Sequence, residues 1–451
     1  MPRARKPKKP DYLKQVLALF AAGDDAGLHD LLARLHPADI AHLLEGLSPD
    51  QRPGVWSRVD VERMGEVLLE LPEAVRTELI KQLDDRTLVA AVHDLDTDDI
   101  ADLIPELSDE LIAEILFALD KQDRQRLDVV LPFAEDTAGG LMNVDAITVR
   151  ENITLEVVLR YLRRRDELPE HTNAFFVVDR DDHVVGVLSV AKLLTSDVAQ
   201  RVSQVMEREL VKFPALTPDK EVAAAFERYN LISAPVVDEN NHLLGRITVD
   251  DVVDVIREQA DRQVMAPAGL SEDDDIFAPV VRTSRKRAIW LGINLVTAFI
   301  AAAVVNLFEH TIEKVAVLAV MMPIVAGMGG NAGTQTLTIV VRALAVGVVS
   351  ESNARRVLMK ELMVGVLNGM LWAVTVAVVT IAWHQNYLVA LALALAMMIN
   401  LVFAALSGVT IPILVRKIGV DPAVASGVIL TTVTDVVGFF AFLGLATLFL
   451  L

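Results

Sequence analysis

The sequence predicts a multi-domain membrane protein with an α-helical repeat domain, a tandem α/β pair, a long connecting helix and a five-helix transmembrane α bundle. Three observations predict this fold class. Leu-rich helical patterns fill the first third of the chain, and a strand–turn–strand–helix pattern then occurs twice. Five apolar stretches follow, each long enough for a membrane span of about 20 residues.

The charge of the chain is unevenly distributed. The 451 residues carry a formal net charge of −19, but residues 285–451 hold only ten of the 42 Lys and Arg and six of the 61 Asp and Glu. The acidic excess therefore lies in residues 1–284, which argues against a nucleic-acid partner. The chain has no cysteine and hence no disulfide or thiolate metal site. Residues 1–10 are predicted to be a disordered basic tail without a secretory signal.

Residues 11–133 predict an acidic domain of short amphipathic helices. Leu, Ile and Ala recur at spacings of three and four, and Asp, Ser and Pro precede the helical patterns as caps. Loosely similar units return about every 17 residues, which indicates a small solenoid-like stack. Asp94 and Asp98 lie on an acidic outer face. This face is either simply solvated or, if a second acidic surface opposes it, a weak divalent-cation site.

A duplication follows the helical domain. Residues 173–194 read as an apolar strand, a polar turn, a second strand and a helix, and residues 233–253 repeat that order. The pattern resembles a tandem pair of CBS domains, with units at 136–198 and 199–256. His183 and His242 occupy equivalent turn positions and are predicted to be exposed turn residues rather than metal ligands.

The resemblance to CBS domains implies a possible adenosyl-nucleotide site in the cleft between the units. By that resemblance Thr248 would meet phosphate and Asp251 the ribose hydroxyls, since a carboxylate accepts from both. The first unit has Ala191 and Lys192 where the acid should stand. A purely structural CBS pair without ATP or a related ligand is the alternative.

Residues 248–275 predict a long acidic helix that overlaps the end of the second unit and breaks near Pro267. Acids at spacings of three and four share one face, where they repel one another by a few tenths of a kcal/mol per pair. These acids are Asp251, Asp254, Glu258 and Asp261, with Asp250 beside them. The helix is either a solvated linker or, since it leads to the membrane, a regulatory element.

The transmembrane domain, residues 285–451, contains five predicted spans. They are 287–308, 315–343, 358–383, 387–415 and 424–450. Basic residues gather before the first span and in the loops after the second and fourth. The positive-inside rule therefore places the acidic domains in the cytoplasm and the C-terminus outside a bacterial-type inner membrane.

Asp435 is a carboxylate near the middle of the fifth span. A charge at this depth is costly and usually marks an ion or substrate path. No Lys or Arg lies at the same depth, so Asp435 is either protonated or visited by a mobile cation. Thr431 and Thr432 surround it with hydroxyl groups.

The second span carries Pro323, four Gly residues, and Asn331 and Gln335 on one helical face. Its glycines permit tight helix packing, or a local break that exposes carbonyl groups. Together the spans supply oxygen ligands only, which suit hard cations such as Mg²⁺. Since one Asp per chain is a sparse site, two copies around a two-fold axis are expected to form a homodimer with the pore on that axis.

The order of these parts is similar to the MgtE family of magnesium transporters over nearly the whole chain. Residues 323–335 and 421–435 resemble that family's membrane signatures. The resemblance implies that Asp435 is the pore carboxylate, that the acidic helix is a plug, and that cytoplasmic Mg²⁺ closes the channel. The implied regulatory acids are Asp94, Asp98, Asp250, Glu258, Asp261 and Asp421. Arg262 stands where the family often has another acid.

The sequence therefore predicts a Mg²⁺-selective, channel-like uptake protein that cytoplasmic Mg²⁺ closes and ATP modulates, and not an enzyme. No Walker-type phosphate loop is present. The alternatives are a transporter of Mn²⁺, Co²⁺ or Ca²⁺, and a non-transporting nucleotide- or ion-sensing membrane protein. A CBS-regulated anion carrier would need mid-membrane basic groups, which the sequence lacks.

Overall fold

The computed structural model describes residues 11–93, 95–165, 168–169, 171–270, 275–350 and 352–451. The chain forms two compact units, and the boundary between them falls inside one helix. The first unit comprises residues 1–260 and 272–279, and the second comprises 261–271 and 280–451. The helical domain and the CBS pair lie in the first unit, and the long apolar helices lie in the second.

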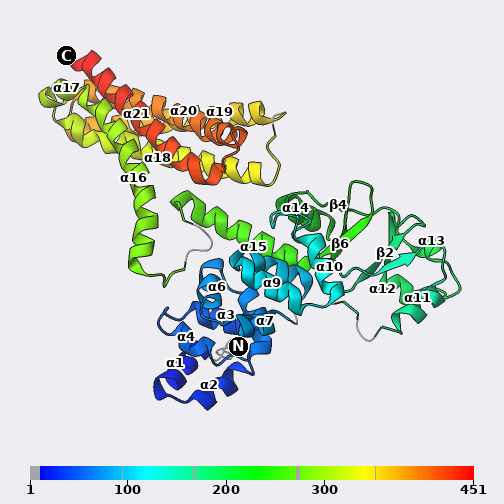
Figure 1. The fold of residues 1–451 in the computed structure, drawn as a ribbon. Coiled ribbons are helices and arrows are strands. Elements are labelled where there is room, and N and C mark those ends of the chain that lie inside the picture. The colour runs from blue at the N-terminus through cyan, green and yellow to red at the C-terminus, as the bar shows by residue number, and fades with distance from the viewer. Residues whose placement is uncertain (1–10, 94, 166–167, 170, 271–274, 351) are drawn as a thin grey trace, which may run out of the picture. The chain divides into compact units, whose positions relative to one another are not determined.

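The helical domain consists of ten short α-helices and one 3-10 turn (Figure 1). The helices are α1 (Tyr12–Ala22), α2 (Asp25–Leu32), α3 (Pro37–Glu45), α4 (Arg52–Trp56), α5 (Val61–Leu69), α6 (Glu73–Ile80), α7 (Asp85–Val92), α8 (Thr97–Leu103), α9 (Asp109–Ala118) and α10 (Lys121–Val130), with η1 at Ile104–Glu106. Helices α3, α5, α7 and α9 begin at residues 37, 61, 85 and 109, a spacing of 24 residues. The helix-pair repeat is therefore 24 residues long, and the predicted unit of about 17 is wrong.

One residue pair sets this repeat. An apolar residue followed by a cap or turn residue returns every twelve positions, as in Leu71–Pro72, Leu83–Asp84 and Leu95–Asp96. The apolar member packs in or against the domain core. The following residue ends one helix connection and starts the next helix, for example where the Asp84 carboxylate accepts from Thr87 N.

The CBS pair contains two three-stranded sheets. The first sheet has the order β1 (Thr148–Arg150), β2 (Ala174–Val178), β3 (Val184–Ser189), and the second has β4 (Phe213–Pro214), β5 (Ser233–Val237), β6 (Leu243–Thr248). In both sheets the first pair of strands is parallel and the second pair is antiparallel. The accompanying helices are α11 (Leu155–Leu162), α12 (Val190–Thr195), α13 (Val202–Val205) and α14 (Asp219–Tyr229).

The two CBS units exchange their flanking segments. Asn143 precedes the first unit but pairs its backbone with Arg246 in the second, with both N–H···O distances at 2.8 Å. Val202 follows the first unit and lies in that unit's core with Phe175. Each core is thus completed by chain from outside its own contiguous segment.

Helix α15 (Val249–Met265) continues directly from β6 and is followed by η2 (Ala266–Ala268). Gly269 ends it with a φ of +69°, a left-handed conformation that glycine adopts without strain. The long acidic helix predicted from the sequence is therefore present, although residues 271–274 lie outside the described chain.

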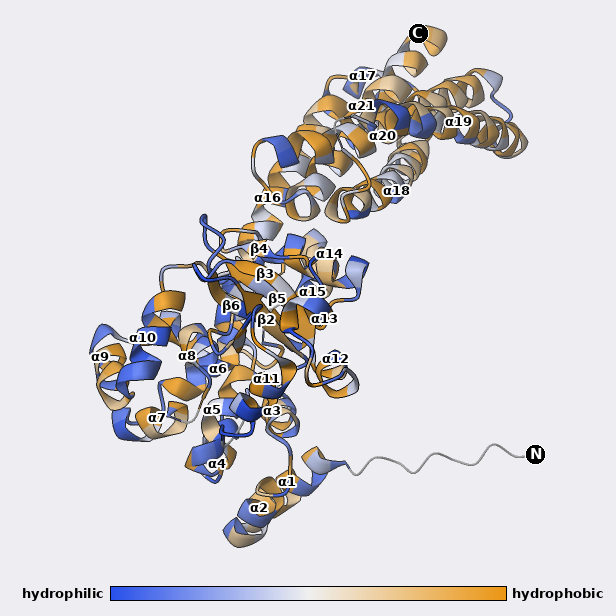
Figure 2. Ribbon diagram, turned by 90° about the vertical axis from the view of Figure 1, so that its right-hand side faces the viewer, coloured by the Kyte–Doolittle hydropathy of each residue, from blue (hydrophilic) through white to orange (hydrophobic). Residues whose placement is uncertain are grey.

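The second unit holds five helices that are long and apolar enough to cross a membrane, which confirms the predicted number. They are α16 (Val280–Asn306), α18 (Val317–Ala345), α19 (Ala354–His384), α20 (Tyr387–Lys417) and α21 (Pro422–Leu450), with the short α17 (Glu309–Lys314) after the first. Figure 2 shows their predominantly hydrophobic colouring, which contrasts with the mixed colouring of α1–α10.

Helix α18 is continuous through Pro323 and its glycines. The glycines serve close packing: a Cβ at Gly329 would lie 2.2 Å from Asn400 Nδ2 of α20, and one at Gly333 would lie 3.0 Å from Leu430 of α21. Of the two uses predicted for these glycines, the structure shows tight helix contact rather than a broken helix.

Candidate functional site

Asp435 lies near the midpoint of α21 and is half-buried. Among the described residues, no ion pair or hydrogen bond to its carboxylate is found. Thr434 next to it is fully buried, and its hydroxyl donates to the Thr431 carbonyl at 3.0 Å. The carboxylate is therefore held on a helix whose neighbouring hydroxyls are fixed, while its own oxygens are available for a cation.

Predicted oxygen ligands on α18 and α21 lie at the surface of the single chain. Asn331 and Gln335 are exposed on one face of α18, and neither hydrogen-bonds Asp435 in the described structure. Thr431 is exposed and Thr432 is half-buried, and both hydroxyls donate to helix carbonyls such as that of Val428. Each Thr oxygen keeps a lone pair for a cation or its water shell.

Asn400 of α20 is a polar residue at the centre of the helix bundle. It is 0% exposed, its Nδ2 donates to the Val325 carbonyl at 2.9 Å, and its Oδ1 has no partner in the described structure. A Cβ at Gly438 of α21 would lie 2.7 Å from Nδ2. Asn400 therefore joins α18, α20 and α21 within one turn of Asp435.

Glu361 of α19 is a second carboxylate inside an apolar helix, and sequence reasoning missed it. It is 5% exposed, accepts from Thr336 Oγ1 of α18 at 3.3 Å, and pairs with Lys360 Nζ at 3.0 Å. Its position one residue after Lys360 made it look like part of a loop charge group. The only signal was that it begins an apolar run on the same helix.

A group of carboxylates from α8 and α15, called here the acidic cluster, lies within the first unit. Its members are Asp96, Asp98, Asp99, Asp102, Asp250 and Asp251. Burial, followed by repulsion between these neighbours, raises the pKa of Asp98, Asp99, Asp102 and Asp251 from 3.8 to about 7. Because several acids are desolvated together, the cluster favours either protons or a bound cation.

The CBS pair contributes further groups to the acidic cluster. Asn143 Nδ2 donates to Asp96 Oδ2 at 3.0 Å and to Asp98 Oδ1 at 3.2 Å. His171 Nε2 lies 3.4 Å from Asp250 Oδ2. Glu135 adds a negative charge that acts on Asp102. The cluster thus spans the helical domain, the CBS pair and the first turn of α15.

The structure brings together only some of the predicted regulatory acids. Asp98 and Asp250 both belong to the acidic cluster, whereas Glu258 and Asp261 are exposed further along α15. Asp421 caps α21 by accepting from Ala423 N at 2.8 Å. Asp94 lies outside the described residues. Asp99 and Asp102 were not singled out from the sequence, because their proximity to α15 arises only on folding.

The predicted nucleotide residues are engaged with carboxylates. Thr248 is 5% exposed, and its hydroxyl donates to Asp250 and, at 3.2 Å, to Asp251 Oδ2. Asp251 also acts electrostatically on Asp99 and Asp102. In this structure both residues therefore face the acidic cluster, and their role in nucleotide binding stays a prediction.

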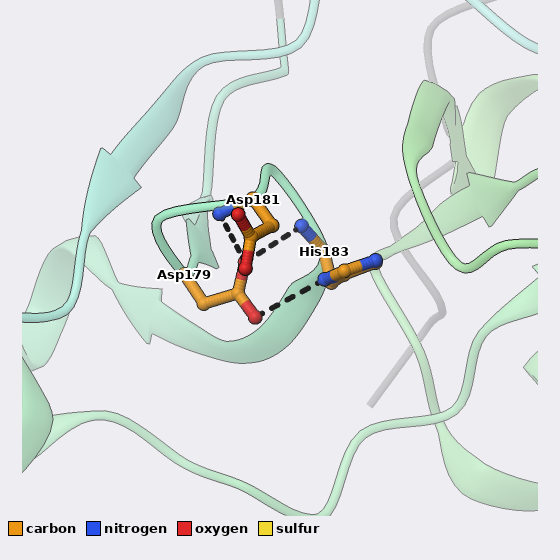
Figure 3. Close-up of side chains that lie close together, drawn as sticks. All are labelled: Asp179, Asp181 and His183. Atoms are coloured by element: carbon orange, nitrogen blue, oxygen red, sulfur yellow. Dashed lines mark hydrogen bonds and ion pairs between the residues drawn. The ribbon is translucent and has the colours of Figure 1, made fainter.

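Asp179, Asp181 and His183 form a third group with metal-ligand side chains (Figure 3). Asp179 Oδ1 accepts from the backbone N–H of Asp181 and His183, and its Oδ2 lies 3.2 Å from His183 Nδ1. The second CBS unit repeats this turn with Asp238 and His242. The repetition identifies the group as a turn-stabilising arrangement.

The two turns meet across the CBS pair. The rings of His183 and His242 stack with centroids 4.8 Å apart. Both side chains are only partly exposed, at 37% and 41%, so the prediction that they are exposed turn residues is wrong. The stack joins the two CBS units.

The three sites consist of carboxylate, amide and hydroxyl oxygens, apart from the imidazole of His171. Such donors suit hard divalent cations, and Mg²⁺ is commonly held by one or two carboxylates with several of its waters retained. A carboxylate in an apolar helix fits a transported cation, and the buried acidic cluster fits a cation held between domains.

Comparison with protein families agrees with this arrangement. Residues 322–445 match the family described as divalent cation transporter, residues 35–136 match the MgtE intracellular N domain, and residues 138–198 and 202–258 match the CBS domain. The five apolar helices and these matches define a multi-pass membrane transporter with an attached CBS pair.

The whole chain also aligns with individual transporters. It is 32% identical over 433 residues to the magnesium transporter MgtE of Thermus thermophilus, covering 95% of this chain and 96% of that protein. It is 28% identical over 440 residues to the MgtE of Bacillus subtilis, with 98% of each covered. The chain therefore belongs to the MgtE family of magnesium transporters, which confirms the predicted resemblance and fold class.

One solved structure shares the soluble region. The cytosolic domain of the Mg²⁺ channel MgtE, in complex with ATP, is 32% identical and covers 54% of this chain and 99% of that chain, with a TM-score of 0.49.

Proposed function

We propose that this protein is a Mg²⁺-selective, channel-like transporter for Mg²⁺ uptake that closes when Mg²⁺ occupies the acidic cluster. The helical domain and CBS pair lie in the cytoplasm of a bacterial-type cell, and the C-terminus lies outside the inner membrane. Asp435 is the pore carboxylate. No covalent chemistry takes part, and the membrane potential drives the ion inward, with about 4.6 kcal/mol per 100 mV for two charges.

The position of Asp435 carries this proposal. A half-buried carboxylate without a basic partner in the described membrane helices is costly in hydrocarbon unless a cation or water reaches it. Exposed Asn331 and Gln335 on α18 would likewise face lipid in a single chain. A second copy that covers these polar faces supports a homodimer with two Asp435 carboxylates at the pore.

The acidic cluster supports closure by Mg²⁺. Buried acids from α8 and α15 repel one another when ionised, so the bare cluster favours separation of the helical domain from the connecting helix. A divalent cation between them removes that repulsion and holds the compact state. Glu258, Asp261 and Asp421 are proposed to meet further Mg²⁺ ions beside α15 and at the start of α21.

The deciding experiment is Mg²⁺ flux into proteoliposomes at low and high Mg²⁺ on the side of the helical domain. We expect the wild type to conduct and to close at high Mg²⁺. Asp435→Asn should be silent while eluting as a folded protein of unchanged size. Asn331→Ala is the comparison variant, with a moderate loss of flux. An Asp435→Asn protein that conducts like the wild type would remove Asp435 from the pore.

Competition between ions separates this proposal from its closest alternative. Mn²⁺, Co²⁺ and Ca²⁺ are added singly as competitors or replace Mg²⁺ as the transported ion. Mg²⁺ selectivity predicts little flux of the replacements, whereas a general divalent transporter carries them equally. Background flux with every ion would favour a non-transporting sensor.

ATP modulation at the CBS pair is a further part of the proposal. CBS units are present, and Thr248 and Asp251 occupy the position that the family resemblance assigns to a nucleotide. Both now contact the acidic cluster, so ATP binding would compete with or reinforce cation binding there. Calorimetric titration with ATP, using wild type and Asp251→Ala with and without Mg²⁺, tests this.

A further inference from the structure

A buried arginine of the helical domain holds the linker that precedes the first membrane helix. Arg52 begins α4 and is 0% exposed. Asp275 lies 223 positions later, five residues before α16, and its side chain is 9% exposed. Both residues belong to the first compact unit.

The contact between them is bidentate. Arg52 Nη1 donates to Asp275 Oδ2 at 2.7 Å, and Nη2 donates to Oδ1 at 2.9 Å. Two parallel charge-assisted hydrogen bonds give this pair both strength and a fixed geometry. Asp275 Oδ1 also accepts from Phe277 N at 2.8 Å, so the carboxylate fixes the turn of the linker.

The remaining donors of Arg52 are occupied by the helical domain. Nε donates to the Leu44 carbonyl at 3.0 Å and Nη2 to the Glu45 carbonyl at 3.4 Å, both at the C-terminal end of α3. Nη1 also donates to Glu78 Oε2 at 3.4 Å. The guanidinium is thus anchored on one side and presents its fork to the linker on the other.

We propose that this pair, called here the Arg52–Asp275 latch, holds the linker against the helical domain in the closed state and must release before the ion path opens. The inference deepens the proposed function, on which it rests. A movement of the helical domain away from the acidic cluster would pull on the linker directly through Arg52. The latch therefore connects that movement to α16 through only four intervening residues, 276–279.

The latch differs from the acidic cluster in its response to ions. Mg²⁺ neutralises repelling carboxylates, whereas the latch is already neutral and needs no cation. It therefore adds a constant bias toward the closed state. Removing it should raise the Mg²⁺ concentration needed for closure without changing conduction through the open pore.

Hydrogen–deuterium exchange of the full-length protein tests whether the linker is held. In Asp275→Asn and Arg52→Met, exchange across residues 275–279 should become about tenfold faster in the presence of Mg²⁺. Arg58→Met is the matched control, because Arg58 pairs with Asp25 in the same domain at 2.8 Å and does not touch the linker. Asp275→Asn also guards against misfolding of the helical domain, since it lies outside the helices.

Flux measurements on the same proteins test the role in closure. The half-closing Mg²⁺ concentration should rise about threefold or more in Asp275→Asn and Arg52→Met but not in Arg58→Met. Unchanged exchange would overturn the latch itself. Faster exchange with unchanged closure would reduce it to a structural contact and overturn its gating role. A wild type that never closes would instead overturn the proposed function, while exchange still reports whether Arg52 holds the linker.

Discussion

At the scale of single residues, Asp98 tests the acidic cluster most directly. Its carboxylate is buried among Asp96 and Asp99, so Asp98→Asn removes repulsion while Asn143 stays available as a neighbour. We expect the free energy of unfolding without divalent cations to rise by about 1–3 kcal/mol, and the Mg²⁺ needed for closure to rise several-fold. Thermal unfolding with a chelator, together with flux, measures both.

Asp85→Asn is the control for Asp98→Asn, because Asp85 is exposed in the first turn of α7. It should leave closure unchanged. If Asp98→Asn destabilises the chelated protein, the acids of the cluster do not repel one another as the structure indicates.

The raised pKa values of the acidic cluster predict a pH dependence with a definite sign. Asp98, Asp99, Asp102 and Asp251 have a pKa of about 7 in the folded state against 3.8 normally, so the folded state binds more protons between these values. Stability without cations should therefore fall as pH rises through this window.

Mg²⁺ should reverse this trend, since it binds the deprotonated carboxylates. Unfolding temperatures recorded from pH 5 to pH 8 should fall with a chelator and fall less with millimolar Mg²⁺. Mg²⁺-dependent closure should weaken as pH drops below about 7. Identical curves with and without Mg²⁺ would contradict cation binding at the cluster.

Glu361 predicts a difference between two substitutions. Glu361→Gln can still accept from Thr336, whereas Glu361→Ala leaves that hydroxyl without its partner on α19. We expect Glu361→Ala to cost about 1–3 kcal/mol and to disturb α18, and Glu361→Gln to cost less. Unfolding in detergent and Mg²⁺ flux distinguish them. Equal behaviour would show that the Thr336 contact does not position α18.

The sequence identified some site residues and not others for a physical reason. Asp435 stands alone in an apolar span, so its cost in hydrocarbon is visible without a fold. Asp102 and Glu135 are ordinary surface acids in the sequence and become neighbours only on folding. Arg52 is equally inconspicuous, because its linker partner lies 223 residues away.

At the scale of helices, adjacent glycines in α18 give a matched pair of substitutions. A Cβ at Gly329 would lie 2.2 Å from Asn400 Nδ2, whereas one at Gly330 would meet nothing within 4 Å. Gly329→Ala should destabilise the helix packing by about 1–3 kcal/mol, and Gly330→Ala should be tolerated in stability. Adding Asn400→Ala to Gly329→Ala should restore part of the loss. Denaturation of the purified protein measures all three.

The helical repeat shows which part of an element pattern is readable from sequence. Helix periodicity and caps predicted short helices correctly, since both are local features. The 24-residue unit was missed because its marker is only one apolar residue and one cap per helix, as at Leu83–Asp84 and Leu95–Asp96. The intervening residues vary with the packing of each helix. Likewise, the exchanged CBS flanks follow from strand pairing between distant segments.

At the scale of the whole molecule, the proposed homodimer predicts a cross-link. The chain contains no cysteine, so a single one at Asn331 is a unique probe. If exposed Asn331 faces its counterpart across the pore, Asn331→Cys should form a disulfide-linked dimer in membranes under mild oxidation. A cysteine at Leu367, an exposed apolar position on α19, should not. Cross-linking at Leu367 alone would place the dimer contact elsewhere.

The exchanged flanks of the CBS pair bear on how the protein is made. The backbone of Asn143 must wait for Arg246, about 100 residues later, before the second sheet is closed, and the first core needs Val202. Since synthesis proceeds from the N-terminus at about 5–20 residues per second, the first unit must remain incomplete for several seconds. Its apolar strands are then exposed to chaperones, and both units reach their final form together, shortly before α16 emerges for membrane insertion.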